Sequence, residues 1–95
     1  HPEQSARHKR NCHLIKQFGI TVEQEELLLQ QQGGICAICL KLITDVRGYH
    51  PHVDHDHTTG KVRGILCFAC NSGLGNFKDN KENLLAAVRY LEKHS

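Results

Sequence analysis

The pattern of hydrophobic and polar positions predicts helices toward both ends of this 95-residue chain. Residues 3–18 have fair helix propensity, with a few apolar side chains among basic ones, and Gly19 ends the segment. The next helix begins at Thr21, whose hydroxyl can cap the following amides while Gln24 reaches back as in a capping box. Gly33 can adopt a left-handed conformation and is expected to stop this helix.

A last helix is predicted to begin after Asp79 or Asn80, either of which can act as its cap. Four apolar side chains fall on one face of this helix: Leu84, Leu85, Val88 and Leu91. We expect that face to form part of the hydrophobic core.

Between the helices, the chain predicts a β-hairpin. His52–His55 is typical of a short strand, residues 58–61 of its turn, and residues 62–66 of the return strand. In a regular strand successive side chains alternate between faces, so Asp54 would point away from His55.

Composition limits what this chain can be. It has no Trp and no Met, so a small domain of this length has a marginal core and benefits from a disulfide or metal staple. The net charge of +2 does not by itself predict a nucleic-acid partner. Residues 1–19 are basic and residues 20–34 acidic, and a basic helix is either a solvated face or a phosphate-contacting arm. No apolar run is long enough for a membrane span, and no signal peptide is visible.

Five cysteines give the strongest chemical signal, and four of them form two C-x-x-C pairs separated by 27 residues. The odd count argues against a closed disulfide set, and the pair spacing suits two thiolates that grip one ion. The expected ligands of a structural Zn²⁺ are Cys36, Cys39, Cys67 and Cys70. Iron in an electron carrier is the alternative ion, but it leaves the intervening histidines unexplained. Cys12 is expected to be a free thiol.

A cluster of histidines and aspartates lies between the cysteine pairs: His50, His52, Asp54, His55, Asp56 and His57. A carboxylate is a hard ligand for Mg²⁺, and a neighbouring imidazole can accept a proton near neutral pH. This pairing suits phosphodiester hydrolysis. The alternatives are additional zinc ligands or a solvated polar loop. A calcium-binding EF-hand loop is rejected, because Thr59 and Ile65 stand where Gly and Glu are required.

Three motifs, C-A-I-C, V-D-H-D-H-T-T-G-K-V-R-G-I-L-C and C-N-S-G-L-G, resemble the recombination endonuclease VII family of HNH nucleases, within the ββα-metal or His-Me finger superfamily. The resemblance runs from about Gly19 to Leu91. It implies a small α+β fold with a zinc-stapled ββα-metal core at 35–78, a helical N-terminal extension at 1–34 and a C-terminal helix at 79–95. We expect residues 1–95 to be one nuclease domain.

The resemblance also implies roles for individual residues. Asp54 and Asn71 would bind a catalytic Mg²⁺ or Mn²⁺, and His55 would be the general base that activates water. His57 and Arg63 would contact DNA phosphates. The implied reaction is endonucleolytic hydrolysis of DNA, by nicking or double-strand cleavage, to 5′-phosphate and 3′-hydroxyl ends. Leu74 is a departure, because the junction-resolving phage enzyme of this family carries an acidic residue three positions after the helix asparagine.

Several alternatives remain open from the sequence. A non-catalytic zinc module that binds nucleic acid would need only the cysteines and basic residues, and would leave Asp54, His55 and Asn71 as a coincidence. The N-terminal helices offer a surface for a homodimer.

Zinc thiolates fit a reduced, cytoplasmic setting, and the resemblance implies a phage or bacterial protein.

Overall fold

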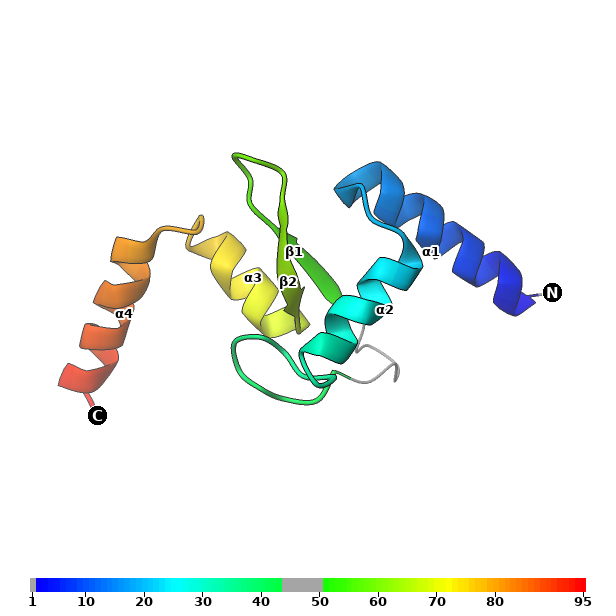
Figure 1. The fold of residues 1–95 in the computed structure, drawn as a ribbon. Helices are drawn as coiled ribbons and strands as arrows, with labels where there is room; N and C mark the ends of the chain where they lie inside the picture. The colour runs from blue at the N-terminus through cyan, green and yellow to red at the C-terminus, as the bar shows by residue number, and fades with distance from the viewer. Residues whose placement is uncertain (1, 44–50) are drawn as a thin grey trace.

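The hairpin lies at the centre of the molecule, and helices extend from it in two directions (Figure 1). The computed structural model describes residues 2–43 and 51–95. The elements, in chain order, are α1 (Pro2–Phe18), α2 (Val22–Gln31), β1 (His52–His55), β2 (Val62–Leu66), α3 (Phe68–Asn76) and α4 (Lys81–Lys93). The small α+β fold is confirmed. His50, the first histidine of the His/Asp cluster, lies outside the described residues.

The boundary between α1 and α2 follows the predicted local chemistry. Gly19 has φ 72°, a conformation that favours glycine, and it ends α1. The Thr21 hydroxyl accepts a hydrogen bond from the Gln24 amide at 3.2 Å, and the Gln24 side chain accepts one from the Thr21 amide at 2.7 Å. The capping box is therefore confirmed, and Gly33 ends this helix with φ 74°.

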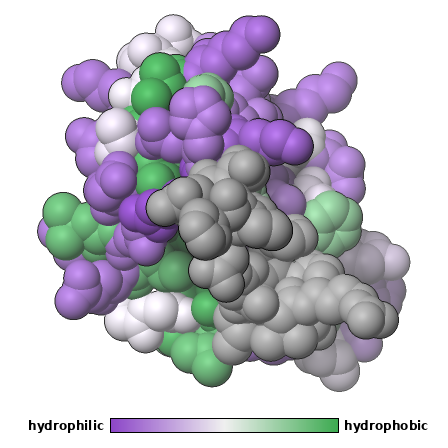
Figure 2. All heavy atoms as spheres, turned by 90° about the vertical axis from the view of Figure 1, so that its right-hand side faces the viewer, coloured by the Kyte–Doolittle hydropathy of each residue, from purple (hydrophilic) through white to green (hydrophobic). Residues whose placement is uncertain are grey.

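Ion pairs between α1 and α2 explain the charge difference between the two segments. Arg7 contacts Glu26 at 2.8 Å on the surface. Arg10 pairs with Glu25, whose side chain is only 6% exposed, and also donates to the Pro51 carbonyl at 3.2 Å. Two of the basic side chains of α1 thus hold it on α2, a role that neither a solvated face nor a phosphate-contacting arm describes. Figure 2 shows this side of the molecule, where hydrophilic side chains cover much of the coloured surface.

Gln32, just after α2, connects three segments of the chain. Its Nε2 donates to the carbonyls of Ile35 and Ile65, each at 2.9 Å, and its Oε1 accepts from the Ile65 amide at 2.8 Å. A small core lies beneath this junction: Leu14, Val22, Cys36, Ile43, Val53, Ile65 and Leu66. Gly64 leaves room for the Gln32 amide, because a Cβ there would lie 3.1 Å from Oε1.

The hairpin forms as predicted but is not regular. Asp54 lies opposite Gly64, whereas the next residue, His55, lies opposite Val62. Arg63 is therefore the extra residue of a β-bulge. A bulge redirects side chains and increases the local twist of a strand. The strict alternation expected for Asp54 and His55 does not hold here.

α3 begins at Phe68, so the second cysteine pair lies at its start, with Cys67 as the N-cap. One expectation about the last helix is wrong. α4 begins after Asn80, which caps the Asn83 amide at 2.9 Å, but its apolar face is not core. Leu85 and Leu91 are 58% and 66% exposed.

The exposure of α4 follows from its position, because it projects from the end opposite α1 (Figure 1). The radius of gyration is 15.3 Å, and the molecule measures 54 Å along its longest axis. A compact chain of this length would have a radius of gyration of ~12 Å, so this molecule is more extended than a compact domain. Within the described residues, no helix is both long and apolar enough to cross a membrane.

We predict that Gln32→Ala lowers the free energy of unfolding by about 1–3 kcal/mol, because it leaves partly buried backbone groups unpaired. Denaturant unfolding followed by circular dichroism measures this loss. Gln31→Ala, an exposed change at the end of the same helix, is the control and should change the free energy little. Equal stability of the two variants would contradict the bridging role of Gln32.

Candidate active site and cysteine cluster

Four cysteine sulfurs come together beneath the hairpin, as the sequence predicted. The Sγ atoms of the cysteine cluster, Cys36, Cys39, Cys67 and Cys70, all lie within 4.8 Å of one another. Those of Cys39 and Cys67 are 3.8 Å apart. Ligands of a tetrahedral Zn²⁺, each ~2.3 Å from the ion, are separated by about 3.8 Å. The donor set and spacing therefore fit zinc, and they leave no position for a reactive water.

Backbone hydrogen bonds shape the two halves of the cluster. In the first half, the Cys36 amide donates to the Lys41 carbonyl at 2.9 Å, and Leu40 turns the chain with φ 64°. The second half lies where β2 passes into α3. The Ala37 amide donates to the Ile65 carbonyl at 3.2 Å, which joins the first half to β2. The cluster is thus assembled by the sheet as well as by any bound ion.

The pKa values of two thiols in the cluster depart from the ordinary value in opposite directions. Burial opposes ionisation of Cys36, but backbone amides of Cys67, Cys39 and Ile38 outweigh it and lower its pKa to about 6. Burial, together with the neighbouring thiols, raises the pKa of Cys70 to about 12. Without a cation, Cys36 therefore ionises more readily than a free thiol, and Cys70 less readily. A divalent cation among the sulfurs would favour the thiolate form of Cys70.

A depression of about 230 Å³ lies beside the hairpin, on the side of α3. Its lining is Phe18, Val53, Asp54, His55, His57, Asn71, Leu74, Gly75 and Asp79. We call it the inner depression. Asp54 and His55 come from β1, and Asn71 from α3. The structure therefore brings together the three residues to which the family resemblance gave catalytic roles.

His55 is held between two rings. Its ring centroid lies 5.2 Å from that of Phe18, the last residue of α1, and 4.6 Å from that of His57. Tilted ring contacts at these distances are favourable and restrict the imidazole. The N-terminal extension therefore reaches the candidate site through Phe18.

Asp54 does not stand free in the inner depression. Arg63 donates to both of its carboxylate oxygens, from Nε at 2.6 Å and from Nη2 at 2.9 Å. The same Nη2 donates to Asp79 at 3.1 Å. The bonds to Asp54, followed by those to Asp79, raise the pKa of Arg63 above its ordinary value. The expected metal ligand and the expected phosphate contact are thus paired with each other.

Asp56 has a structural position in the hairpin turn. Its Oδ1 accepts from the amides of Thr58 at 2.7 Å and Thr59 at 3.0 Å. The amides of Thr59 and Thr58 lower the pKa of the Asp56 carboxyl. Asp56 thus shapes the turn that follows the alternating His/Asp segment.

Asn71 is positioned by the beginning of α3. Its amide donates to the Cys67 carbonyl at 3.0 Å, within the first helical turn. Asn71 directly follows Cys70, so the first turn of α3 carries both the second cysteine pair and Asn71.

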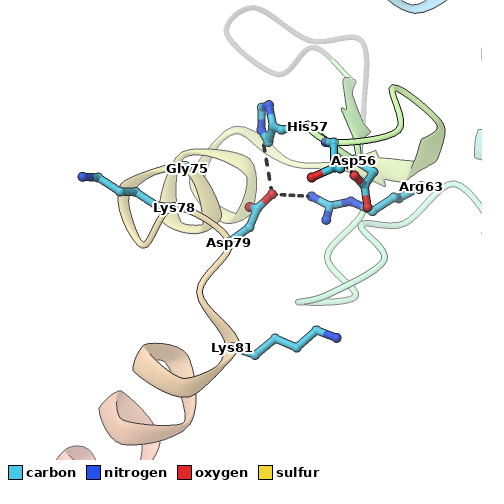
Figure 3. Close-up of a pocket in the computed structure, with 8 residues that line it drawn as sticks. Asp56, His57, Arg63, Gly75, Lys78, Asp79 and Lys81 are labelled. Carbon is cyan, nitrogen blue, oxygen red and sulfur yellow. Dashed lines mark hydrogen bonds and ion pairs between the residues drawn. The ribbon is translucent and has the colours of Figure 1, made fainter.

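Sequence reasoning missed two residues of this site. Phe18 gave only an apolar signal at the end of a helix, and Asp79 was interpreted as a helix cap. Asp79 instead lies between His57, at 3.8 Å from Nε2, and Arg63 (Figure 3). Phe18 and Asp79 are both distant in sequence from the residues they contact, so sequence spacing alone does not identify them.

Comparison with known proteins agrees with this arrangement. The sequence profile of recombination endonuclease VII matches residues 11–93. The Gene 59 proteins of Mycobacterium phages D29 and L5 are 41% and 38% identical over 81 and 79 residues, which is 84% and 82% of this chain. The chain spans about half the length of these curated relatives, 48% and 47%.

Among solved structures, the ββα-Me type II restriction endonuclease Hpy99I is similar, with a TM-score of 0.58 and 32% identity. The match covers 90% of this chain and 49% of Hpy99I. It shows that the hairpin and α3 form the ββα-metal fold. Together with the profile match over most of its length, this shows that the chain belongs to the recombination endonuclease VII family.

Proposed function

We propose that this chain is a metal-dependent DNA endonuclease of the HNH type. The observation that carries the proposal is the inner depression, where an aspartate, a histidine and an asparagine meet from β1 and α3. Family membership and the ββα-metal fold support the same activity. The phage origin of the curated relatives supports a cytoplasmic setting.

Asp54 and Asn71 would hold a divalent ion, because carboxylate and amide oxygens are the ligands that Mg²⁺ and Mn²⁺ prefer. The bound ion would neutralise charge on the phosphate and on the leaving 3′ oxygen. Binding requires Asp54 to release at least one oxygen from Arg63.

His55 is the proposed general base. It takes a proton from a water that attacks phosphorus in line with the 3′ oxygen. The bond from phosphorus to that oxygen breaks, and the departing oxygen takes a proton from solvent, which leaves 5′-phosphate and 3′-hydroxyl ends. The rings of Phe18 and His57 orient the imidazole, so that one nitrogen can face the water. His57 and Arg63 are proposed to contact phosphate from the same rim.

The cysteine cluster is proposed to bind a structural Zn²⁺ that holds β2 and α3 together. The alternative function, a non-catalytic zinc module for nucleic-acid binding, uses the same cluster. It gives no reason for Asp54, His55 and Asn71 to line one depression, so the endonuclease is preferred.

We predict that His55→Ala lowers DNA cleavage by about 10²–10⁴-fold, because general-base catalysis contributes that much. Nicking of supercoiled plasmid with Mg²⁺ or Mn²⁺, and with EDTA added, measures the loss. DNA binding and the circular dichroism spectrum should be unchanged. His94→Ala, an exposed change beyond α4, is the control. Cleavage by His55→Ala at the wild-type rate would show that the assignment is wrong.

We predict that Cys39→Ser loses its zinc and its cleavage activity, although Cys39 does not line the inner depression. The expected reason is that Asn71 loses its fixed position relative to β1. Zinc content by mass spectrometry and plasmid nicking are measured together. Cys12→Ser, which removes the exposed cysteine outside the cluster, should keep both. A folded Cys39→Ser protein with full activity would refute this role.

A further inference from the structure

Arg63 contacts two carboxylates, Asp54 and Asp79, and the proposed function uses only Asp54 as a metal ligand. The proposed function requires an oxygen of Asp54 for the divalent ion, yet Arg63 occupies both oxygens. The Asp54 side chain is only 12% exposed, so water can replace the guanidinium only in part. An ion that approaches Asp54 therefore competes with Arg63.

Asp79 offers Arg63 a second position. Nη2 already contacts both carboxylates, at 2.9 Å for Asp54 and 3.1 Å for Asp79. A small rotation of the guanidinium can thus exchange its contacts with Asp54 for further contacts with Asp79. Because the charged group keeps a carboxylate partner throughout, the exchange avoids leaving it unpaired.

The backbone holds Asp79 where this exchange needs it. Lys78 and Asp79 both have left-handed conformations, with φ 54° and 56°, which are uncommon for residues other than glycine. The Asp79 amide also donates to the Leu74 carbonyl at 2.9 Å, at the end of α3. In Figure 3 the Asp79 carboxylate lies between the side chains of His57 and Arg63.

There is space on the far side of Arg63 for this movement. A second depression, of about 500 Å³, lies next to the inner one and is lined by Arg63, Asp79, His57 and Lys81, among others. We call it the outer depression. Asp79 lines both depressions and so stands at their border, whereas Arg63 lines the outer one and reaches Asp54 of the inner one through its hydrogen bonds.

We infer that Arg63 competes with the catalytic divalent ion for Asp54, and that Asp79 is a positioning residue that draws Arg63 away so that the ion can bind. This inference rests on the proposed function, since it assumes an ion at Asp54. Contact with Asp79 would also keep Arg63 beside the site after it leaves Asp54. In that position Arg63 can make the phosphate contact proposed for it.

The test is a double-mutant cycle on Mn²⁺ binding, measured by the electron paramagnetic resonance of free Mn²⁺ with the full, zinc-loaded chain and no DNA. Arg63→Gln should tighten Mn²⁺ binding at least about threefold, because the competitor is gone. Asp79→Asn should weaken it by about threefold. In the Arg63→Gln background, Asp79→Asn should have no further effect.

The controls separate this inference from simpler explanations. Lys81→Gln removes a positive charge from the outer depression without removing a contact to Asp54, and it should change affinity less than Arg63→Gln. Should Arg63→Gln fail to fold, Arg63→Lys tests the same point, because a lysine cannot bind both oxygens in parallel.

Three outcomes distinguish the claims. Equal effects of Asp79→Asn in both backgrounds would overturn the inference, because Asp79 would then act on the ion directly or by charge alone. Unchanged affinity in Arg63→Gln, with binding still lost in Asp54→Asn, would also overturn the inference but leave the proposed function intact. Absence of Mn²⁺ binding to the wild type, or wild-type binding by Asp54→Asn, would overturn the proposed metal site itself.

Discussion

The junction between β2 and α3 is the constraint on which the candidate site depends. Two of the four clustered cysteines lie there, Cys67 as the N-cap of α3 and Cys70 in its first turn. Asn71 follows directly, so the direction of α3 relative to β1 is set by the same few residues that gather the sulfurs. Burial alone stabilises a small domain with so limited a core only marginally, and an ion bound by the four cysteines would add a cross-link there.

Side-chain hydrogen bonds and ion pairs connect the other elements to one another. Gln32 connects the end of α2 to β2, and the pair of Arg10 with the buried Glu25 holds α1 on α2. Through α1, Phe18 reaches His55. The N-terminal helices therefore support the site. Their opposite charges form ion pairs between α1 and α2.

The β-bulge at Arg63 is the feature that most changes the chemistry of the site. Without the register shift, Asp54 and His55 would point to opposite faces. With it, both line the inner depression, and Arg63 is brought to Asp54 and Asp79. One positive side chain is thus shared between two carboxylates at the edge of the site, an arrangement that could not be read from any one of the three residues.

The sequence by itself determined the elements whose signals are local. The capping box at Thr21, the glycine stops, the hairpin and the paired cysteines depend on neighbouring backbone groups or on spacing along the chain, and all were predicted correctly. Only the tertiary structure decided that Phe18 meets His55, that Asp79 meets Arg63, and that the apolar face of α4 stays exposed. Those features depend on how distant segments pack, and neither periodicity nor cap chemistry specifies which segments will meet. The same limit explains the bulge, because a one-residue register shift is set by contacts between two strands and not by the alternation within either.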